Sequence, residues 1–415
     1  MASKVVSRQS KKLVERVSAR VFCHNLDDDG GNPVTIFSSP HRLSHTTKQE
    51  LAQSCEWESV IVHQNHHQNQ QQQQRLPLVQ NNRVQQKPQL SFYMPSGEQV
   101  SFCAHAAMGA ALEICAQNDE ERMDHDHKNS NNNNINQDDE NENYDDDVFF
   151  TVANVPNDDD DNDNDTSNNN EEEQEYHTQM YEGDIVALHM STTYQQCPVS
   201  QPSMLFRALR EYCHVETQAV ASVPLPSSSS NTKNRFFSKE QPGNSDYEKS
   251  YNYVTCHASI ARPKTLVPLR SVELLHAARP PALSSAPGFA VTCKALDDTT
   301  GLYLFAKSQE EDGAWECRQF PRASGYPEDP ATGIAAAALA CHLRQELRID
   351  LPAYKLYQGT AMGKPSLIVV DELIMTPRKE EDIMDASFRL LGRVEIDERS
   401  TIEVDDDDDD DDDVE

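Results

Sequence analysis

The sequence predicts an α+β fold made of two similar halves, each a curled β-sheet around a central α-helix. Two apolar segments rich in alanine support this prediction, one beginning near His105 and the other at Pro330. Both are apolar nearly all round, as is typical of a helix that is buried on every side. Similar turns precede them, at residues 94–98 and 324–328. The chain therefore has the pattern of a diverged internal duplication.

Its length and its strand-forming segments fit this architecture. At 415 residues the chain is long enough for two domains, because one hydrophobic core rarely grows beyond roughly 250–300 residues. Short runs of β-branched and aromatic residues predict strands in both halves. In chain order the predicted strands are Val14–Phe22, Val34–Phe37, Leu90–Tyr93, Val148–Val155, Ile185–Met190, Tyr253–Ile260, Phe289–Ala295, Leu302–Lys307, Trp315–Phe320 and Ser366–Val370.

Polar, low-complexity segments separate several of these elements and are interpreted as loop insertions. We expect them to be disordered, because they cannot bury enough apolar area to offset the loss of chain entropy. Such insertions are tolerated, since the entropy of loop closure grows slowly with length. The insertions are residues 64–88, 118–147, 157–175 and 224–248, and residues 401–415 are an acidic tail. Around them we expect an N-terminal extension at 1–13, a first half at 14–205, a second half at 206–385, and a strand at 386–400 that returns to the first half.

The formal net charge of −33 is concentrated in these appendages. Residues 119–147, 157–175 and 405–415 hold most of the excess acidic side chains, and the rest of the chain is close to neutral. Because no basic stripe is present, the sequence argues against a nucleic-acid partner. The aspartate runs leave cation binding open, although they lack the spaced ligands and the turn glycine of a folded calcium loop.

Cysteine usage and hydropathy indicate the compartment. The ten cysteines are scattered without a CxxC pair, which is typical of reduced thiols. Residues 1–12 are polar and basic, with no apolar core for a signal peptide. No stretch approaches the roughly 20 apolar residues that a membrane-spanning helix needs. We therefore expect a cytoplasmic protein that does not contact a membrane.

Four short motifs occur in an order that is found in a known family. Residues 31–34 read Gly-Asn-Pro-Val, residues 103–111 read Cys-Ala-His-Ala-Ala-Met-Gly-Ala-Ala, residues 328–335 read Glu-Asp-Pro-Ala-Thr-Gly-Ile-Ala, and Gln358-Gly359 is followed by Met-Gly-Lys-Pro-Ser at 362–366. A looser fifth match is Trp-Glu-Ser-Val-Ile-Val at 57–62. From about residue 14 to residue 397, insertions excepted, the chain resembles the phenazine-biosynthesis (PhzF-like) family of isomerases and epimerases.

The resemblance implies a fold shared with diaminopimelate epimerase and proline racemase. In that fold each half wraps a barrel-like sheet around its helix, and the active-site cleft lies between the halves. It further implies an isomerase or epimerase that uses neither a cofactor nor a metal ion. Such an enzyme moves a carbon-bound proton on a small carboxylate or amino-acid-like substrate. The resemblance leaves a homodimer open.

Three residues match the catalytic positions of the family, namely Glu58, His105 and Asp329. Glu58 would take the proton and return it, because desolvation in a closed cleft raises the pKa of a carboxylate towards the working pH. His105 and Asp329 would orient the substrate and assist the proton transfer. Each residue also has a structural alternative: a surface glutamate at a strand start, a hydrogen-bonded histidine, and an N-cap followed by Pro330 in the first helical turn.

Further positions resemble the family's substrate-binding residues: Ala104, Ala106, Thr332, Gly333, Ile334, Gln358 and Gly359. If both helix N-termini face the cleft, their free N–H groups and dipoles favour an anion such as a substrate carboxylate. Gly109 and Gly333 would permit close approach of the backbone. For Gln358 and Gly359, a structural turn before the strand at Ser366 is the alternative.

Three departures from the family pattern lie at this predicted anion site. The family has glycine, threonine and serine where this chain has Ala104, Ala107 and Ile334. Each change removes a hydrogen-bond donor or adds bulk, so we expect an altered specificity. The alternative function is a catalytically inactive family member that binds a small anion or a protein partner. Glu58 distinguishes the two, because only the enzyme needs it.

Two other mechanisms are less favoured by the sequence. Racemases of this fold use one cysteine from each half. Cys103 stands at the first of these positions, but Pro330 stands near the second, which argues against that mechanism. A metal site at residues 66–67 or 124–127, which contain histidine and aspartate, would lie in insertions without a rigid frame.

Overall fold

The computed structural model describes residues 10–25, 29–63, 87–129, 147–153, 175–181, 184–221, 255–378 and 383–406. For residues 10, 119–129 and 406, only the backbone is described. The predicted disorder of residues 64–88, 157–175 and 224–248 therefore concerns segments that lie almost wholly outside the described residues. The same holds for most of the acidic tail.

The described strands form one continuous sheet that closes into two rings. The first ring contains β1 (Ser10–Cys23), β2 (Asn32–Ser39), β3 (Ser59–His63), β4 (Gln89–Tyr93), β6 (Asp147–Val152) and β7 (Glu175–Tyr181). The second ring contains β9 (Cys256–Ser259), β10 (Pro263–Pro268), β11 (Gly301–Lys307), β12 (Ala314–Pro321), β13 (Ala353–Gln358) and β14 (Ser366–Pro377). Two strands belong to both rings, β8 (Ile185–Pro198) and β15 (Ile383–Asp406), and the short β5 (Gln99–Val100) pairs with β4.

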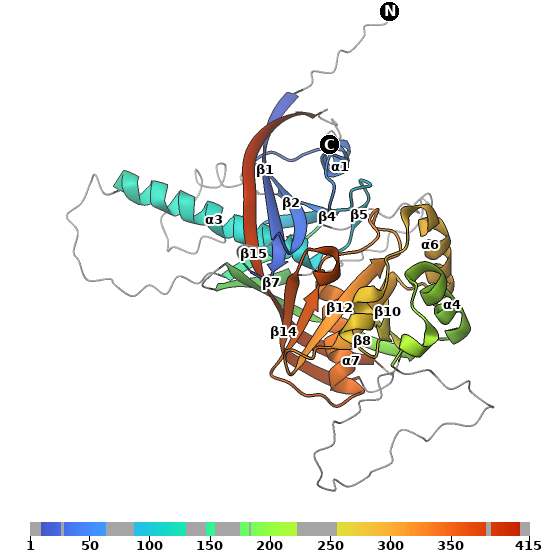
Figure 1. Ribbon diagram of the computed structural model, residues 1–415. Coiled ribbons are helices and arrows are strands. Elements are labelled where there is room, and N and C mark those ends of the chain that lie inside the picture. Colours follow the sequence, from blue (N-terminus) through green and yellow to red (C-terminus); the bar gives the residue numbers. More distant parts are fainter. Residues whose placement is uncertain are drawn as a thin grey trace, which may run out of the picture.

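The long strand β15 joins the halves. Residues 384–391 of this strand pair with β14 on one edge and with β8 on the other. Its second part, residues 393–406, pairs with β1. Figure 1 shows β1 and β15 running side by side away from the second ring. Because one strand supplies an edge to each ring, the two halves are continuous through the backbone hydrogen bonds of the sheet.

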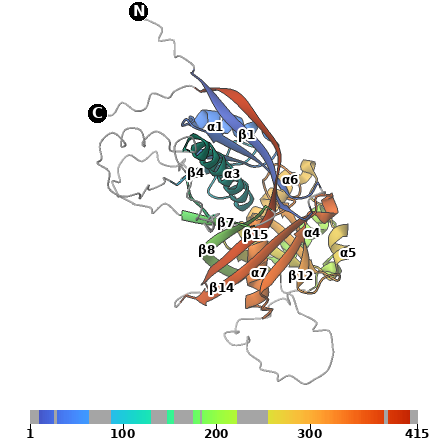
Figure 2. The ribbon, with the colours of Figure 1, turned by 90° about the vertical axis from the view of Figure 1, so that its left-hand side faces the viewer.

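Each ring surrounds one helix. α3 (Ala104–Asn129) contacts β1, β2, β3 and β8, and α7 (Gly333–Gln345) contacts β9, β10, β14 and β15. Figures 1 and 2 show the two helices in separate halves of the molecule. Alanine and glycine dominate the buried turns of both, which makes the helices thin enough for strands to close around them. The predicted fold class, two halves each with a curled sheet around a central helix, is confirmed.

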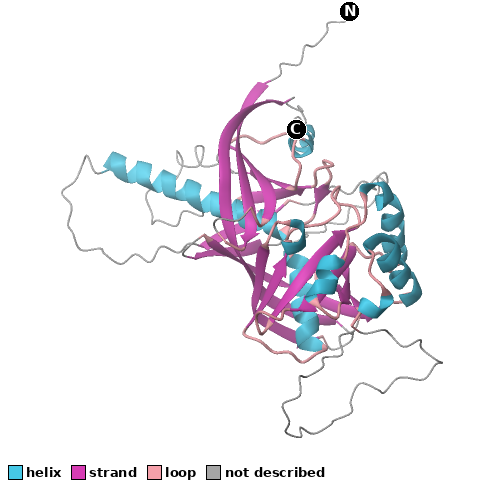
Figure 3. Cartoon of the chain, viewed as in Figure 1, coloured by secondary structure: helices cyan, strands magenta, loops and turns pink. Residues whose placement is uncertain are grey.

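Further helices cover the outside of the rings (Figure 3). α4 (Pro202–Cys213), α5 (Val272–Ala277) and α6 (Ala286–Ala295) share a hydrophobic core with the outward side chains of β10, β11 and β12. α1 (His45–Gln53) packs on the first ring and is capped by Ser44, whose hydroxyl accepts a hydrogen bond from the Thr47 N–H at 3.1 Å. Short 3₁₀ turns lie at Thr217–Ala219, Leu283–Ser285 and Thr360–Met362. No helix in the described part of the chain is long and apolar enough to cross a membrane.

Three details of the predicted elements are wrong. Residues 289–295 belong to α6 and not to a strand, because Pro287 favours a first helical turn and Phe289 and Cys293 lie one turn apart on its buried face. α3 continues to Asn129, into the predicted insertion at 118–147, through residues 120–122, which are good helix formers. β15 continues to Asp406, into the predicted tail at 401–415, since β1 pairs with it along that length.

Candidate active site

The first residues of α3 and α7 lie against each other between the rings. A Cβ atom placed on Gly333 would lie 3.5 Å from the Cβ of Ala104 and 3.1 Å from the ring of Phe22. The missing side chain of Gly333 therefore mainly leaves room for the ring of Phe22, and the distance to Ala104 shows that the first residues of the two helices are in contact. The two N-termini face one another, as the sequence predicts, and polar residues from both halves come together beside them.

Glu58, His105 and Asp329 form a buried cluster at this junction, with 6, 7 and 9% of their surfaces exposed. Glu58 Oε2 lies 3.9 Å from His105 Nε2. Asn32 connects the halves, because its Nδ2 donates to Asp329 Oδ1 at 2.9 Å and lies 3.5 Å from His105 Nδ1. It also donates to the carbonyl of Ala331 at 2.6 Å. The structure thus brings together the three residues that match the catalytic positions.

Local backbone structure positions each side chain. Glu58 directly precedes β3, and its carbonyl oxygen accepts a hydrogen bond from the N–H of Thr35 on β2 at 3.1 Å. His105 is the second residue of α3. Asp329 forms an isolated antiparallel bridge with Gln319 of β12, and its N–H donates to the Gln319 carbonyl at 3.1 Å. Strand ends and a helix start therefore hold all three residues.

Asp329 is not the N-cap of α7, and this prediction is corrected. The helix begins at Gly333, with Thr332 in the cap position. The Asp329 carboxylate instead bonds within the preceding turn, where Oδ1 accepts from the Ala331 N–H at 3.2 Å and Oδ2 accepts from the Thr332 hydroxyl at 2.7 Å. This turn takes the place of the helix start that was predicted at Pro330. It directs the Asp329 carboxylate towards Asn32.

Burial perturbs all three titratable groups. Desolvation and the neighbouring Glu58 raise the pKa of Asp329 to about 6. Desolvation lowers the pKa of His105 to about 4, so its imidazole is neutral at pH 7. Desolvation also raises the pKa of Glu58, although a hydrogen bond from Tyr326 and the charge of Arg262 act in the opposite direction. Ionisable groups perturbed by burial and by one another are frequent in active sites.

The two oxygens of Glu58 differ in their surroundings. Oε1 accepts a hydrogen bond from the hydroxyl of Tyr326, whose ring packs 5.0 Å from that of Trp57. Oε2 is buried and has no hydrogen-bond partner among the described residues. Tyr326 was not singled out as a site residue from the sequence, although the turn before Asp329 that contains it was recognised.

The predicted substrate-binding residues differ in what they can offer a ligand. Ala104, Ala106 and Gly333 are buried, and Ala106 is fully so. Thr332 and Ile334 are half-buried. The Thr332 hydroxyl is already engaged with Asp329, and Ile334 packs against the core around the two central helices. Of these side chains, those of Thr332 and Ile334 are the most accessible to a ligand.

Gln358 and Gly359 support the turn before α7. Gln358 Nε2 donates to the Asp329 carbonyl at 2.7 Å, and its Oε1 accepts from the Tyr303 hydroxyl at 3.1 Å. Gly359 has a φ of 78°, and a Cβ there would lie 2.0 Å from the carbonyl oxygen of Lys364. These contacts favour the structural alternative that the sequence left open for the pair.

The surroundings of Gly109 and Cys103 do not support a ligand-binding or nucleophilic role for these two residues. A Cβ on Gly109 would lie 3.1 Å from a methyl group of Val34, so this glycine serves packing of α3 on β2 and not the approach of a ligand. Cys103 Sγ lies 3.3 Å from His105 Nδ1, and burial together with the charge of Glu58 raises the pKa of its thiol. A protonated thiol is a poor base and nucleophile, which disfavours cysteine chemistry at this site.

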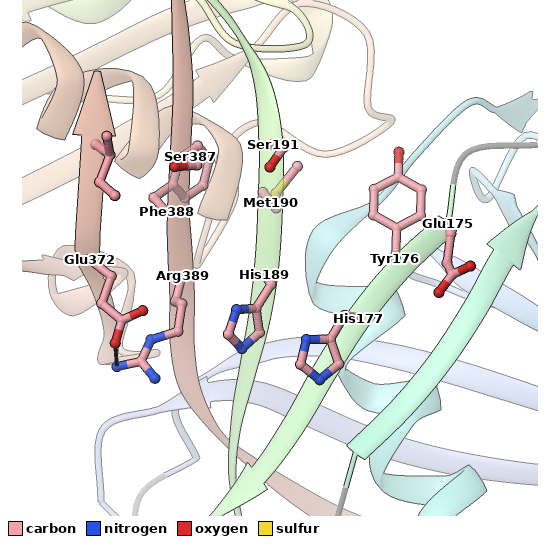
Figure 4. Close-up of a pocket in the computed structure, with 11 residues that line it drawn as sticks. Glu175, Tyr176, His177, His189, Met190, Ser191, Glu372, Ser387, Phe388 and Arg389 are labelled. Carbon is pink, nitrogen blue, oxygen red and sulfur yellow. Dashed lines mark ion pairs between the residues drawn. The ribbon is translucent and has the colours of Figure 1, made fainter. Parts of the chain in front are cut away.

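A separate cavity of about 320 Å³ lies over β7, β8, β14 and β15 (Figure 4). Its lining includes His189, Arg389 and Glu372, and it shares no residue with the Glu58 cluster. Arg389 pairs with Asp371 at 2.8 Å and with Glu372 at 3.1 Å, so its charge is already neutralised. We therefore assign the candidate chemistry to the buried cluster between the halves.

The described residues thus form an α+β fold of two similar halves, with a buried cluster of two carboxylates and an imidazole between them. Residues 211–387 match the family model of phenazine biosynthesis-like proteins (PhzC-PhzF). This match confirms the resemblance to the PhzF-like family that the sequence motifs indicate. No curated protein sequence matches the chain.

Solved structures of PhzF-family proteins share the fold. The phenazine biosynthesis protein of the PhzF family from Bacillus anthracis superposes with a TM-score of 0.58 at 12% identity, covering 94% of this chain and 99% of that one. A predicted epimerase from Pseudomonas aeruginosa gives 0.53 at 14% identity, with 94% and 98% covered. A putative PhzC/PhzF protein from Clostridium difficile gives 0.52 at 13% identity, with 94% and 100% covered. At these identities the likeness establishes the fold.

Proposed function

We propose that the protein is a cofactor-independent isomerase or epimerase that moves a carbon-bound proton on a small carboxylate or amino-acid-like substrate. The observation that carries this proposal is the buried cluster in which Glu58 and His105 of the first half meet Asp329 of the second. The family match supports it, as does a fold shared with a structure described as a predicted epimerase.

Glu58 is the proton carrier in this proposal. Burial raises its pKa, which strengthens the carboxylate as a base. Because Oε2 has no hydrogen-bond partner among the described residues, it can take a proton without breaking an existing bond. The carboxylate removes a proton from a substrate carbon and becomes a carboxylic acid. It then returns the proton to a different carbon, which completes an isomerisation.

His105 and Asp329 assist this transfer. The neutral imidazole can donate a hydrogen bond to the oxygen on which negative charge develops as the proton leaves. Asp329 carries a pKa of about 6 and is fixed by Asn32, so it is placed to orient the substrate or to exchange a proton itself. In this proposal the carboxylate of the first half carries the proton, and the carboxylate of the second half is held in place by its hydrogen bonds.

A second candidate function is a catalytically inactive family member that binds a small anion. Tyr326 favours it, because its hydroxyl occupies one oxygen of Glu58. The cluster is also less than one-tenth exposed, so a substrate reaches Glu58 only if the halves move apart or Tyr326 swings away. The replacement of the family serine by Ile334 points in the same direction.

The test is deuterium incorporation from D₂O. Small carboxylic and amino acids that raise the melting temperature are incubated in D₂O with the wild type, Glu58→Gln and Glu56→Gln. Glu56 is an exposed neighbour and serves as the matched control. We expect exchange with the wild type and the control, and a loss of at least about a hundredfold with Glu58→Gln at unchanged stability. Absence of exchange with every stabilising compound would favour the inactive anion-binding protein.

A further inference from the structure

Lys264 of β10 is a buried cation without a bonded partner. It is 8% exposed, and among the described residues no hydrogen bond or ion pair reaches its ammonium group. Its charge acts on Asp329, which is its strongest electrostatic neighbour of opposite sign. A lysine buried without a partner is costly. The ammonium group is therefore available to donate hydrogen bonds to an anionic ligand.

The strand directs Lys264 towards the interior of the second ring. Leu266, two residues later, packs in the core around α7, whereas Val267 packs against the outer helices. Alternate residues of a strand face the same side of the sheet. Lys264 thus lies on the side of β10 that faces α7. The turn that contains Asp329 comes directly before that helix.

Gln319 of β12 adds a second unpartnered polar group on this side. Its neighbour two residues earlier, Cys317, packs in the core around α7. Gln319 is fully buried, and neither Nε2 nor Oε1 has a hydrogen-bond partner among the described residues. Gly301 on the intervening β11 makes room for it, because a Cβ there would lie 2.5 Å from Gln319 Nε2. The parallel pairing of β10 with β11 places Gly301 beside Lys264.

Arg262 extends this positive region to the first half. It lies in the turn between β9 and β10, and its Nη2 donates to the carbonyl of Phe102, just before α3, at 3.4 Å. Its charge lowers the pKa of Glu58 and of Cys103. The β9–β10 hairpin therefore places one cation near each of the two carboxylates of the site.

We propose that Lys264 and Gln319 form the subsite that binds the carboxylate of the substrate, with Arg262 adding positive charge at the junction of the halves. This inference rests on the proposed function and names the groups that orient the substrate there. A carboxylate would accept hydrogen bonds from the Lys264 ammonium and from Gln319 Nε2, which satisfies two donors that the protein leaves without partners. The anion would then be held by strands of the second half, and not mainly by the helix starts at Ala104 and Gly333.

Binding of acetate, propionate and benzoate tests the subsite, with benzamide as the neutral counterpart of benzoate. Calorimetry should detect binding of at least one of these carboxylates to the wild type and no binding of benzamide. Lys264→Met keeps the chain length without the charge and should weaken that binding at least tenfold. Lys307→Met, on the neighbouring β11 where the side chain is exposed, is the matched control and should bind like the wild type. If no carboxylate binds the wild type, or if Lys264→Met binds equally well, the subsite is wrong.

Two further measurements separate lost binding from misfolding and from failure of the proposed function. Lys264→Met should melt at or above the temperature of the wild type, because it removes a buried charge without a partner. Glu58→Gln should keep carboxylate binding while it loses deuterium exchange. If Glu58→Gln exchanges normally and Lys264→Met fails to bind, the proposed proton carrier is wrong and the subsite stands. If Glu58→Gln loses exchange and Lys264→Met still binds the carboxylate, the subsite is wrong and the proposed function stands.

The pH dependence of carboxylate binding gives an independent readout. Burial lowers the pKa of Lys264 to about 8. The other groups that act on it are Asp329, Arg262, Cys293 and Arg322. Of these, burial raises the pKa of Asp329 to about 6 and that of Cys293 to about 12. Affinity should therefore fall as the pH rises through about 8 and the ammonium loses its proton, and this step should be missing in Lys264→Met.

Discussion

The two carboxylates of the site are held in opposite ways. Asp329 of the second half accepts hydrogen bonds from Asn32, Ala331 and Thr332. Glu58 of the first half accepts one from a tyrosine hydroxyl, and its other oxygen has no hydrogen-bond partner among the described residues. Donated hydrogen bonds favour the ionised form of Asp329, although burial and the neighbouring Glu58 still raise its pKa to about 6, whereas Oε2 of Glu58 can accept a proton without breaking a hydrogen bond. The comparison shows one carboxylate that is fixed by several donors and one with a free oxygen, which fits the roles proposed for them.

The local structure of each half explains this difference. In the second half, the turn at residues 329–332 precedes α7 and is supported from β13 by Gln358, which bonds the Asp329 carbonyl and the Thr332 hydroxyl. In the first half, Glu58 directly precedes β3 and is not part of the segment before α3, which begins at Ala104. The supporting network therefore lies mainly in the second half, with Asn32 of the first half as one further donor, and the following predictions test whether it sets the roles of the two carboxylates.

The largest expected effect is a difference in turnover between variants of the two carboxylates. Glu58→Gln should lower turnover by at least about a hundredfold, because an amide cannot carry the proton. Asp329→Asn keeps most of the turn and should lower it by about tenfold, the equivalent of about one hydrogen bond. Rates of deuterium exchange at saturating substrate measure both. Equal losses in the two variants would contradict the different roles proposed for the two carboxylates.

Asp329→Asn should also change how stability depends on pH. The pKa of Asp329 is raised from 3.8 to about 6 in the fold, so its contribution to stability is present below pH 3.8 and lost as the pH rises through 6. His105 acts in the opposite direction, since its pKa is lowered from 6.5 to about 4 and its contribution is lost as the pH falls through 4. Because His105 is present in both proteins, its desolvation cancels in their comparison, and only its interaction with the Asp329 charge remains in the difference.

The expected result is a difference in the free energy of unfolding, wild type minus Asp329→Asn, that falls by up to about 1.4 kcal/mol per pH unit in this window. Urea denaturation at half-unit pH steps between the two pKa values measures it. A difference that stays constant with pH would mean that Asp329 is not desolvated in the folded protein.

Gln358→Leu tests the network that fixes the second carboxylate. It leaves the Tyr303 hydroxyl and the Asp329 carbonyl without their partner, so the free energy of unfolding should fall by about 1–3 kcal/mol. Gln195→Leu, on the exposed side of β8, is the control and should have little effect. A loss of carboxylate affinity without a loss of stability would instead restore the substrate-binding role that the resemblance implies for Gln358.

Ile334→Ser should give the smallest effect. It restores the hydroxyl that the family has at the start of α7, where Ile334 is half-buried against the core. Stability should fall by about 1 kcal/mol, because part of a buried apolar side chain is lost. Affinity for acetate or benzoate, measured by calorimetry, should stay close to that of the wild type, because the strands of the second half hold the anion. A clear rise in affinity would place the anion at the start of α7 and contradict the subsite of Lys264 and Gln319.

The amino-acid sequence alone was sufficient for the architecture and for the residues that meet at its centre. A helix that is apolar all round must be enclosed, and two such helices after similar turns predict two enclosing sheets. The motifs around Glu58, His105 and Asp329 identified the cluster, and the Gly-Asn-Pro motif already contained Asn32. Where only local composition was available, as at residues 289–295, the prediction was wrong, because β-branched residues also occur in a packed helix that begins at a proline.

Only the tertiary structure decided how these residues are partnered. The residues next to a lysine in a short strand, such as Lys264, do not indicate whether its side chain is buried or exposed. Its burial follows from the closure of the second ring, in which β10 and β12 flank the glycine at the start of β11. The capping of α7, the two environments of Glu58 and the free donors of Lys264 and Gln319 depend on the same long-range strand pairing. Sequence periodicity encodes which face of a strand is buried, but it does not encode which distant strand lies opposite.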